Sequence, residues 1–334
     1  MKFNRISSYL ANPDIARLLI LSRMLMLVGQ NDEARRSLIE FFEQHRPEAQ
    51  SYTKNAARRR NRILADAADR LADIYAMDSQ TDRGLEFFQR LLRRNPGWSA
   101  AYRGLCRLMF PGNSHIQTLE TVHKAIRPRF YVEIGVAQGD TLSRALPSTE
   151  AVGVDPRPQF VPDKNSKISV YRETSDAFFS AYEQRTQFAN RKIDMAFIDG
   201  LHHFEQALRD FINVEKRSAA DGLIVLHDCI PFDDVNSGRD DNVEYWVGDV
   251  WKCLAVLLDR RPDLDIRIIG APPSGLVLVR HLNSASRALE ENFDSLVKNY
   301  MPLRCADWDL KYAKRIQIIP SLTAVIDQMF AGPQ

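Results

Sequence analysis

The sequence Arg129-Phe-Tyr-Val-Glu-Ile-Gly-Val-Ala-Gln-Gly-Asp-Thr141 is an apolar run that leads into two glycines. The run predicts a β-strand, and the residues after it predict a tight turn and the start of a helix. Glycine permits backbone conformations that other residues avoid, and it lets a ligand approach without a Cβ in the way. The spacing Glu133-x-Gly135-x-x-x-Gly139 differs from the G-x-G-x-x-G of dinucleotide enzymes, which disfavours a dehydrogenase. The turn indicates a nucleotide-type site, although purely structural turns use the same residues.

The composition is that of an ordinary globular chain. With 334 residues, 45% of them hydrophobic, the chain is long enough for one large domain or two medium ones. The formal net charge of +2 lacks the basic excess that would make nucleic acid the expected partner. The first residues lack the apolar core of a signal peptide, and no run approaches the roughly 18 apolar residues that span a bilayer. We therefore expect a cytoplasmic protein without a membrane span.

The amino-terminal part, residues 1–112, predicts an all-α domain. Apolar residues recur at helical spacing, as in Leu38 and Phe42, and no alternating run occurs. The segment around Pro96 and Trp98 resembles the join between tetratricopeptide-type repeats. Helical pairs of that kind present a surface to a protein partner or pack two subunits of a homo-oligomer together. The alternative is a plain helical cap on the following domain.

After Pro111-Gly112 the pattern changes, and short apolar runs begin to alternate with amphipathic helical segments. The alternation predicts a mostly parallel sheet with helices on both faces. The runs are residues 131–136, 151–155, 168–171, 193–199, 222–228, 264–269 and 275–280. The last two are joined only by Gly270-Ala-Pro-Pro-Ser274, too short for a crossover helix, so the last strand should be antiparallel. We expect this domain over residues 113–282 and a helical extension over residues 283–334.

Carboxylates follow most of the predicted strands. In an open sheet of this kind, ligands bind beyond the carboxyl ends of the strands. The acidic residues at these ends are Glu133, Asp155, Asp176 next to Ser175 in a helix start, Asp199 and Asp228. A carboxylate can accept hydrogen bonds from both hydroxyls of a ribose, so Asp155 is the expected sugar ligand, with helix capping as the alternative.

Taken together, these residues resemble the class I S-adenosylmethionine-dependent methyltransferases. The segment Asp199-Gly-Leu-His202-His-Phe-Glu205 and the later His227-Asp228 are similar to a group that includes O-methyltransferases of sugars and macrolide-type natural products. Some members of that group use a divalent metal. The resemblance covers about residues 126–280. It implies a Rossmann-like methyltransferase sheet, S-adenosylmethionine as cofactor, and a small molecule or glycan as acceptor.

The resemblance also implies a place for each candidate cofactor ligand. The turn with Gly135 and Gly139 would lie under the methionine part of the cofactor, with Glu133 positioned to meet that end. Asp155 would bind the ribose, and Asp199 would lie against the cofactor as well. Asp176 and Ser175 would contact the adenine, or else cap a helix.

A hydroxyl acceptor needs its proton removed or its pKa lowered before it attacks a methyl group. Asp199 and Asp228 could hold Mg²⁺ or a similar cation, which would acidify a bound hydroxyl. His202, three residues after Asp199, could complete the metal site or act as the general base, since the ordinary pKa of histidine lies near neutral pH. His227 and His203 are alternatives for either role. Capping and surface roles stay open for all of them.

Two other functions are compatible with the sequence. One is an interaction protein built on the amino-terminal helices, with a methyltransferase-like domain that is not catalytic. The other is a metal-dependent hydrolase on the same sheet, because a fold does not fix a function. The presence of the complete set of glycines and strand-end carboxylates favours the methyltransferase over both.

Overall fold

A computed structural model of this protein describes residues 13–44, 54–164, 166–188, 191–243 and 245–331. The chain forms two compact units. The first is Met1–Met109 with Asn242–Tyr245, and the second is Phe110–Asp241 with Trp246–Gln334. Within the described ranges, no helix has the length and apolar character needed to cross a membrane.

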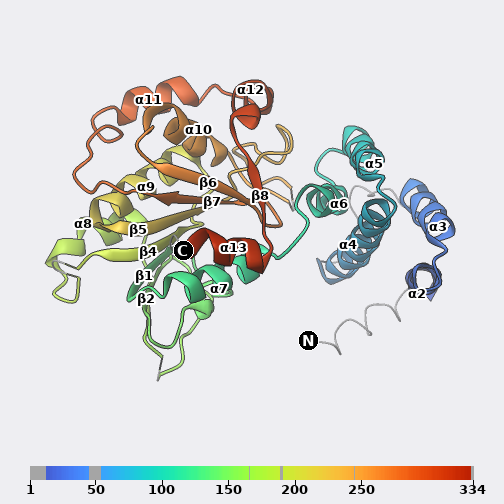
Figure 1. Cartoon of the computed structure of the whole chain (residues 1–334), viewed down its shortest axis with the longest axis horizontal. Helices are drawn as coiled ribbons and strands as arrows, with labels where there is room; N and C mark the ends of the chain where they lie inside the picture. The colour runs from blue at the N-terminus through green and yellow to red at the C-terminus, as the bar shows by residue number, and fades with distance from the viewer. Residues whose placement is uncertain (1–12, 45–53, 165, 189–190, 244, 332–334) are drawn as a thin grey trace. The chain divides into compact units, whose positions relative to one another are not determined.

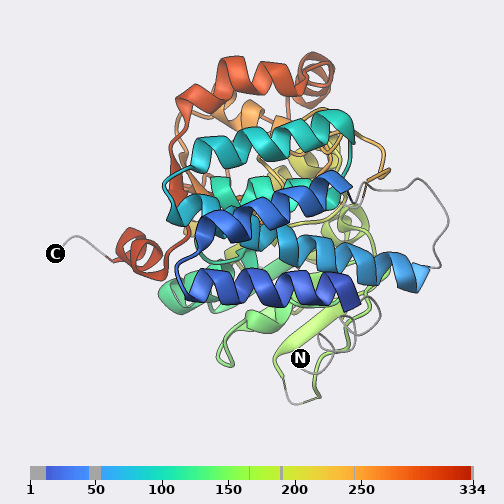
Figure 2. The same cartoon turned by 90° about the vertical axis from the view of Figure 1, so that its right-hand side faces the viewer.

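The first unit is helical, which confirms the all-α prediction for the amino-terminal part. Its helices are α2 (Pro13–Leu27), α3 (Asn31–Gln44), α4 (Lys54–Met77), α5 (Thr81–Arg94) and α6 (Ser99–Met109). Figure 2 shows them lying side by side. Aromatic rings fill the space between them, since Phe42 of α3 packs edge-on against Phe88 of α5 and against Trp98. The likeness to tetratricopeptide repeats stays a prediction.

The second unit is built on an eight-stranded sheet (Figure 1). The strands are β1 (Phe130–Ile134), β2 (Glu150–Val154), β3 (Ile168–Tyr171), β4 (Ile193–Ile198), β5 (Ser218–His227), β6 (Asp265–Gly270), β7 (Leu276–Arg280) and β8 (Ile318–Pro320). Their order is β3-β2-β1-β4-β5-β7-β6-β8. Strands β1 to β5 pair in parallel, and β7 runs antiparallel to both of its neighbours. This confirms the Rossmann-like, mostly parallel sheet with an antiparallel strand.

Strand β8 lies in the region where the sequence predicts only helices. It pairs in parallel with β6 at the edge of the sheet. Three residues are too few to give a periodic signal, which is why the sequence pattern misses it. Just beyond it, Ser321 forms a bridge with Gly112, and its carbonyl accepts a hydrogen bond from the Asn113 N–H. The first and last segments of the second unit therefore lie side by side.

Helices cover both faces of this sheet. The helices of this unit are α7 (His115–Ile126), α8 (Ser175–Ser180), α9 (Phe204–Arg217), α10 (Trp251–Arg260), α11 (Phe293–Tyr300), α12 (Cys305–Asp307) and α13 (Thr323–Phe330). On one face, Leu119 of α7 and Ile326 of α13 pack against Tyr131 and Phe197 of the sheet. Helix α9 contacts β4 and β5 and is itself covered by α10. Figure 1 shows α9 and α10 on the side of the strands opposite to α7 and α13.

The turn after β1 differs from the expected start of a helix. Only one short 3-10 turn follows it, over Leu142–Arg144. Pro147 comes three residues later, and a proline disfavours the helical conformation in the residue before it. The segment therefore cannot extend into a long helix at this point.

Candidate active site

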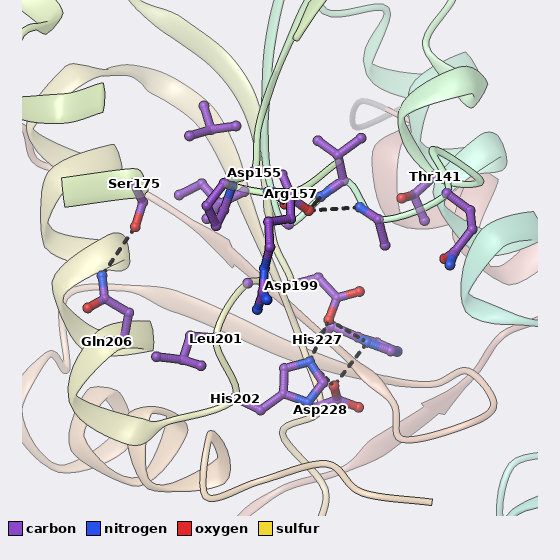
Figure 3. Close-up of a pocket in the computed structure, with 18 of the residues that line it drawn as sticks. Thr141, Asp155, Arg157, Ser175, Asp199, Leu201, His202, Gln206, His227 and Asp228 are labelled. Atoms are coloured by element: carbon purple, nitrogen blue, oxygen red, sulfur yellow. Dashed lines mark hydrogen bonds and ion pairs between the residues drawn. The ribbon is translucent and has the colours of Figure 1, made fainter. Parts of the chain in front are cut away.

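A cavity of about 1030 Å³ lies at the carboxyl ends of β1, β2, β4 and β5. The neighbours of β1 are β2 and β4, so the strand order reverses here, which is where open sheets bind their ligands. The sequence-predicted residues that line the cavity are Gly135, Asp155, Ser175, Asp176, Asp199, His202, His227 and Asp228. Gly139 and Glu133 do not line it. Figure 3 shows the labelled side chains converging on this space.

The glycine turn is held against two strand ends. Gly135 has a φ of +87°, and a Cβ at this position would lie 1.9 Å from the carbonyl oxygen of Asp199. The Asp155 carboxylate accepts hydrogen bonds from the N–H groups of Val136 and Ala137 at 3.0 and 2.9 Å. A third N–H, that of Arg157, donates to it at 2.7 Å. Asp155 thus ties the turn to the end of β2 while it faces the cavity.

Glu133 lies beneath the turn and is fully buried. Its carboxylate accepts hydrogen bonds from the Tyr131 hydroxyl at 2.5 Å and the Thr141 hydroxyl at 2.7 Å. Burial raises the pKa of Glu133 to about 8, although these hydrogen bonds act to lower it. Thr141 does line the cavity. Glu133 therefore reaches the cavity through Thr141 rather than directly.

A cluster of two carboxylates and two imidazoles forms the floor of the cavity (Figure 3). His202 Nε2 lies 3.3 Å from Asp199 Oδ1 and 3.1 Å from Asp228 Oδ2. His227 Nδ1 lies 3.1 Å from Asp199 Oδ1 and 3.4 Å from Asp228 Oδ2. Ser274 closes the cluster from the turn between β6 and β7, because its hydroxyl donates to Asp228 Oδ1 and lies 3.3 Å from His227 Nε2.

The charges in this cluster perturb one another. Burial disfavours the charged form of His227, but the carboxylates of Asp228 and Asp199 outweigh it and raise its pKa well above the ordinary value. The pKa of His202 is raised in the same way, against the effect of burial. The pKa of Asp199 is lowered, because His227 and His202 outweigh the burial that would raise it. The two imidazoles and the Asp199 carboxylate therefore favour one another's charged forms.

The cluster also suits a divalent cation. Asp199, His202 and Asp228 each offer a ligand atom, and these atoms lie within 4.8 Å of one another. Ligands at right angles on Mg²⁺, each about 2.1 Å from the ion, are roughly 3 Å apart. The separations of 3.1 and 3.3 Å between His202 Nε2 and the two carboxylate oxygens match that spacing. The two oxygens and one nitrogen fit a hard or borderline cation.

Ser175 and Asp176 line the cavity from the start of α8, where Thr174 forms the N-cap. The Gln206 side-chain amide of α9 donates to Ser175 Oγ and Asp176 Oδ1, both at 3.2 Å. The same nitrogen, which carries two hydrogens, also lies 3.1 Å from Asp210 Oδ1, and burial raises the pKa of Asp210 to about 7. A polar patch with several donors and acceptors therefore lies next to α8.

Sequence reasoning missed several residues that line the cavity. Among them are His115, Arg157, Gln206 and Trp246. Gln206 directly follows the segment Asp199–Glu205 that resembles the methyltransferases, and it lies one helical turn before Asp210. The sequence therefore offers a signal for this residue. Trp246 stacks on His202 with ring centroids 5.1 Å apart. His115 and Trp246 come from distant parts of the chain, and no local pattern links them to the strand ends.

The sequence-predicted candidate His203 points away from the cavity, since its Nε2 lies 3.2 Å from the Arg239 carbonyl oxygen.

Comparison with protein-family models gives a match over part of the chain. Residues 132–229 match the model of a family described as a methyltransferase domain. The match runs from β1 to the residue after Asp228, so it includes the glycine turn and the carboxylates of the cavity. No curated protein matches the sequence significantly.

Several solved structures are similar to this chain. One is an O-methyltransferase from Bacillus cereus in complex with SAH (S-adenosylhomocysteine), with 12% identity and a TM-score of 0.38 over 59% of this chain and 90% of that one. Another is the SAH-bound methyltransferase PaMTH1 of Podospora anserina, with 13% identity and a TM-score of 0.37 over 70% and 98% of the two chains. A third is the O-methyltransferase TomG of Streptomyces achromogenes in complex with SAM, with 14% identity and a TM-score of 0.35 over 50% and 80%.

Proposed function

We infer that this chain, which contains a class I S-adenosylmethionine-dependent methyltransferase domain, methylates a hydroxyl of a sugar-containing or other small-molecule acceptor. One observation carries the proposal: a single cavity combines the glycine turn and Asp155 with the carboxylates of Asp199 and Asp228. The first pair suits a nucleoside donor, and the second suits a hydroxyl held beside a divalent cation.

The donor is proposed to lie across the ends of β1 and β2. Asp155 would accept a hydrogen bond from the ribose. A carboxylate has about four lone-pair sites, and backbone N–H groups use three of those of Asp155. One site is left for a ribose hydroxyl, so binding both hydroxyls requires the turn to release one N–H. Ser175 and Asp176, held by Gln206, would contact the adenine.

The methionine part of the donor is proposed to rest on the turn with Gly135 and Gly139. Glu133 would support this turn through Thr141, whose hydroxyl donates a hydrogen bond to it. Asp199 lies where the turn touches β4, so its carboxylate would face both the donor and the acceptor. This arrangement aligns the two reactants, which is the main requirement of an in-line methyl transfer.

The acceptor is proposed to lie over the cluster on the cavity floor. Asp199, Asp228 and His202 would hold a divalent cation, which lowers the pKa of a bound hydroxyl when present. His227 would hold the two carboxylates in place through Nδ1, as its contacts with both of them suggest. In this proposal Asp199, His202 and His227 form the catalytic machinery.

We propose the domain division 1–112, 113–282 and 283–334, and a cytoplasmic location. The division of the chain near Met109 supports the first boundary. We also propose that the helical domain binds a protein partner or a second copy of the chain. Helix α2 supports this, because its apolar residues Ile20, Met24 and Leu27 are exposed. Light scattering of the full chain, with and without serine substitutions at these three positions, tests whether the helical domain binds a second copy of the chain.

The proposed activity is tested by calorimetry with S-adenosylhomocysteine, with and without Mg²⁺. We expect binding to the native chain and to Asp221→Asn, an exposed carboxylate outside the cavity that serves as the control. Absence of binding in both conditions would overturn the proposal. If binding and turnover prove independent of metal and of chelators, only the role of the cation fails.

A further inference from the structure

His115 is the first residue of α7 and lies at the edge of the cavity, far in sequence from the strand ends. Two of its groups bind the same acceptor in the turn between β6 and β7. The backbone N–H of His115 donates to the Pro272 carbonyl oxygen at 2.9 Å, and its Nδ1 lies 3.1 Å from that oxygen. The ring packs against the His227 ring with centroids 4.7 Å apart. The position of this imidazole is thus fixed by two elements.

The contact with Pro272 also fixes the tautomer. A carbonyl oxygen can only accept, so Nδ1 must carry the hydrogen of this bond. In a neutral imidazole the other nitrogen, Nε2, then has a free lone pair. Within the described parts of the chain, Nε2 of His115 has no hydrogen-bond partner. It is therefore free to accept a hydrogen bond from a molecule in the cavity.

The two other histidines of the cavity do not present a free lone pair to its interior. His227 engages both nitrogens, Nδ1 with the carboxylates and Nε2 beside the Ser274 hydroxyl. His202 points Nε2 at Asp199 and Asp228, and its Nδ1 is buried without a partner, out of reach of the cavity. A cation bound to the carboxylates would engage His202 Nε2 as well. Of the histidines that line the cavity, His115 alone offers a lone pair to the acceptor.

We propose that Nε2 of His115 is the general base that takes the proton from the acceptor hydroxyl. This inference rests on the proposed function. The O–H bond of the acceptor breaks and its proton moves to Nε2. The oxygen lone pair forms a bond to the methyl carbon of S-adenosylmethionine, and the electrons of the carbon–sulfur bond stay on sulfur. The positive charge of the sulfonium is thereby replaced by that of an imidazolium, and the proton leaves to solvent afterwards.

The surroundings of His115 keep it ready for this role. Burial lowers its pKa, and the neighbouring His227 lowers it further. The hydrogen bond to Pro272 and the charges of Asp199 and Asp228 act in the opposite direction and are outweighed. Its place at the amino-terminal end of α7 also disfavours a positive charge. His115 is therefore neutral at neutral pH and able to accept a proton.

The tautomer is tested by ¹⁵N NMR of the full chain labelled at its histidines, at neutral pH. The His115 signals are assigned by their loss in His115→Gln, and His281→Gln, at an exposed position outside the cavity, is the control. We expect a protonated Nδ1 and an unprotonated Nε2 in His115. A protonated Nε2, alone or together with Nδ1, would overturn the proposal. This result does not depend on donor binding, so it is distinct from a failure of the proposed function.

The reaction is tested with catechol as a probe acceptor, with Mg²⁺ present, by following release of S-adenosylhomocysteine. His115→Gln should lower kcat by at least about a hundredfold, the lower end of the usual contribution of a general base. Its affinity for S-adenosylhomocysteine and its unfolding midpoint should match those of His281→Gln. An unchanged kcat with catechol would refute the role. If the native chain does not turn over catechol, the ¹⁵N chemical shifts of His115 alone decide whether Nε2 can act as the base.

Discussion

Gly135→Ala tests the link between the glycine turn and the catalytic carboxylates. The new Cβ would lie 1.9 Å from the carbonyl oxygen and 2.5 Å from the carbonyl carbon of Asp199. Both of these atoms belong to the backbone at the end of β4 and cannot rotate away as a side chain would. Because nonbonded carbon contacts need more than about 3 Å, the turn and Asp199 must separate by roughly 1 Å or more. The substitution therefore moves the carboxylate that is proposed to face both reactants.

The magnitude can be divided into two parts with a matched control. At a φ of +87°, a residue with a Cβ costs about 1–2 kcal/mol. Overpacking against fixed atoms costs a further 1–3 kcal/mol or so. Gly29 has a similar φ of +77°, but a Cβ there meets nothing within 4 Å. Gly29→Ala should therefore show only the first part, about 1–2 kcal/mol, and Gly135→Ala about 2–5 kcal/mol.

The two variants are compared by urea unfolding and by calorimetry with S-adenosylhomocysteine. We expect Gly135→Ala to lose affinity by more than about tenfold, or 1.4 kcal/mol, and turnover by about a hundredfold, as a misplacement of 1 Å can do. Gly29→Ala should keep both. If the two variants lose equal stability and bind equally well, the proposed contact between Gly135 and Asp199 does not constrain the site, and the reasoning fails.

Three further results are expected. Asp155→Ala should weaken binding of S-adenosylhomocysteine by about tenfold or more, because charge-assisted hydrogen bonds contribute about 1.5–3 kcal/mol each; unchanged calorimetric affinity would exclude a ribose contact. Burial raises the pKa of Glu133 in the folded state to about 8. Between the ordinary pKa of a glutamate and this value, the folded state therefore keeps a proton that the unfolded state has lost. The contribution of Glu133 to the free energy of unfolding is full below about pH 4.5. It declines by up to about 1.4 kcal/mol per pH unit until the pH passes the pKa of the folded state. Urea midpoints of Glu133→Gln should lack this decline, and parallel pH profiles for variant and native chain would contradict it. Finally, Mg²⁺ should stabilise the native chain by about 2.7 kcal/mol at a hundred times its Kd, measured as a rise in melting temperature. Asp228→Asn should abolish the rise and Asp221→Asn should not; a similar rise in both would place the cation elsewhere.

The sequence predicts the sheet and much of the cavity because both depend on local signals. Each strand is an apolar run, and parallel strands bring their carboxyl ends to one edge, so the sequence alone is enough to group Asp155, Asp199 and Asp228. Their hydrogen bonds could not be predicted in the same way. The Asp155 carboxylate accepts hydrogen bonds from three backbone N–H groups, and a strand pattern does not show how closely such groups approach a side chain.

Residues supplied by tertiary packing gave no signal in the sequence. His115 reaches the cavity because α7 packs against the turn between β6 and β7, and nothing around it in the sequence resembles a motif. Glu133 was expected to meet the ligand, but its side chain points below the turn, where the hydroxyls of Tyr131 and Thr141 donate hydrogen bonds to it. The alternation of residues along a strand shows on which face of the sheet a side chain lies. It does not show whether the carboxylate reaches the cavity or stays buried below the turn.

The bridge between Gly112 and Ser321 has a consequence for how this unit can be rearranged. A domain whose first and last segments lie side by side tolerates insertion into a loop of another protein, and it tolerates circular permutation, because neither change requires its backbone to move. A transplanted or circularly permuted form of this unit keeps the order of its eight strands, but it must still carry Asn242–Tyr245, because that segment clusters with the amino-terminal helices.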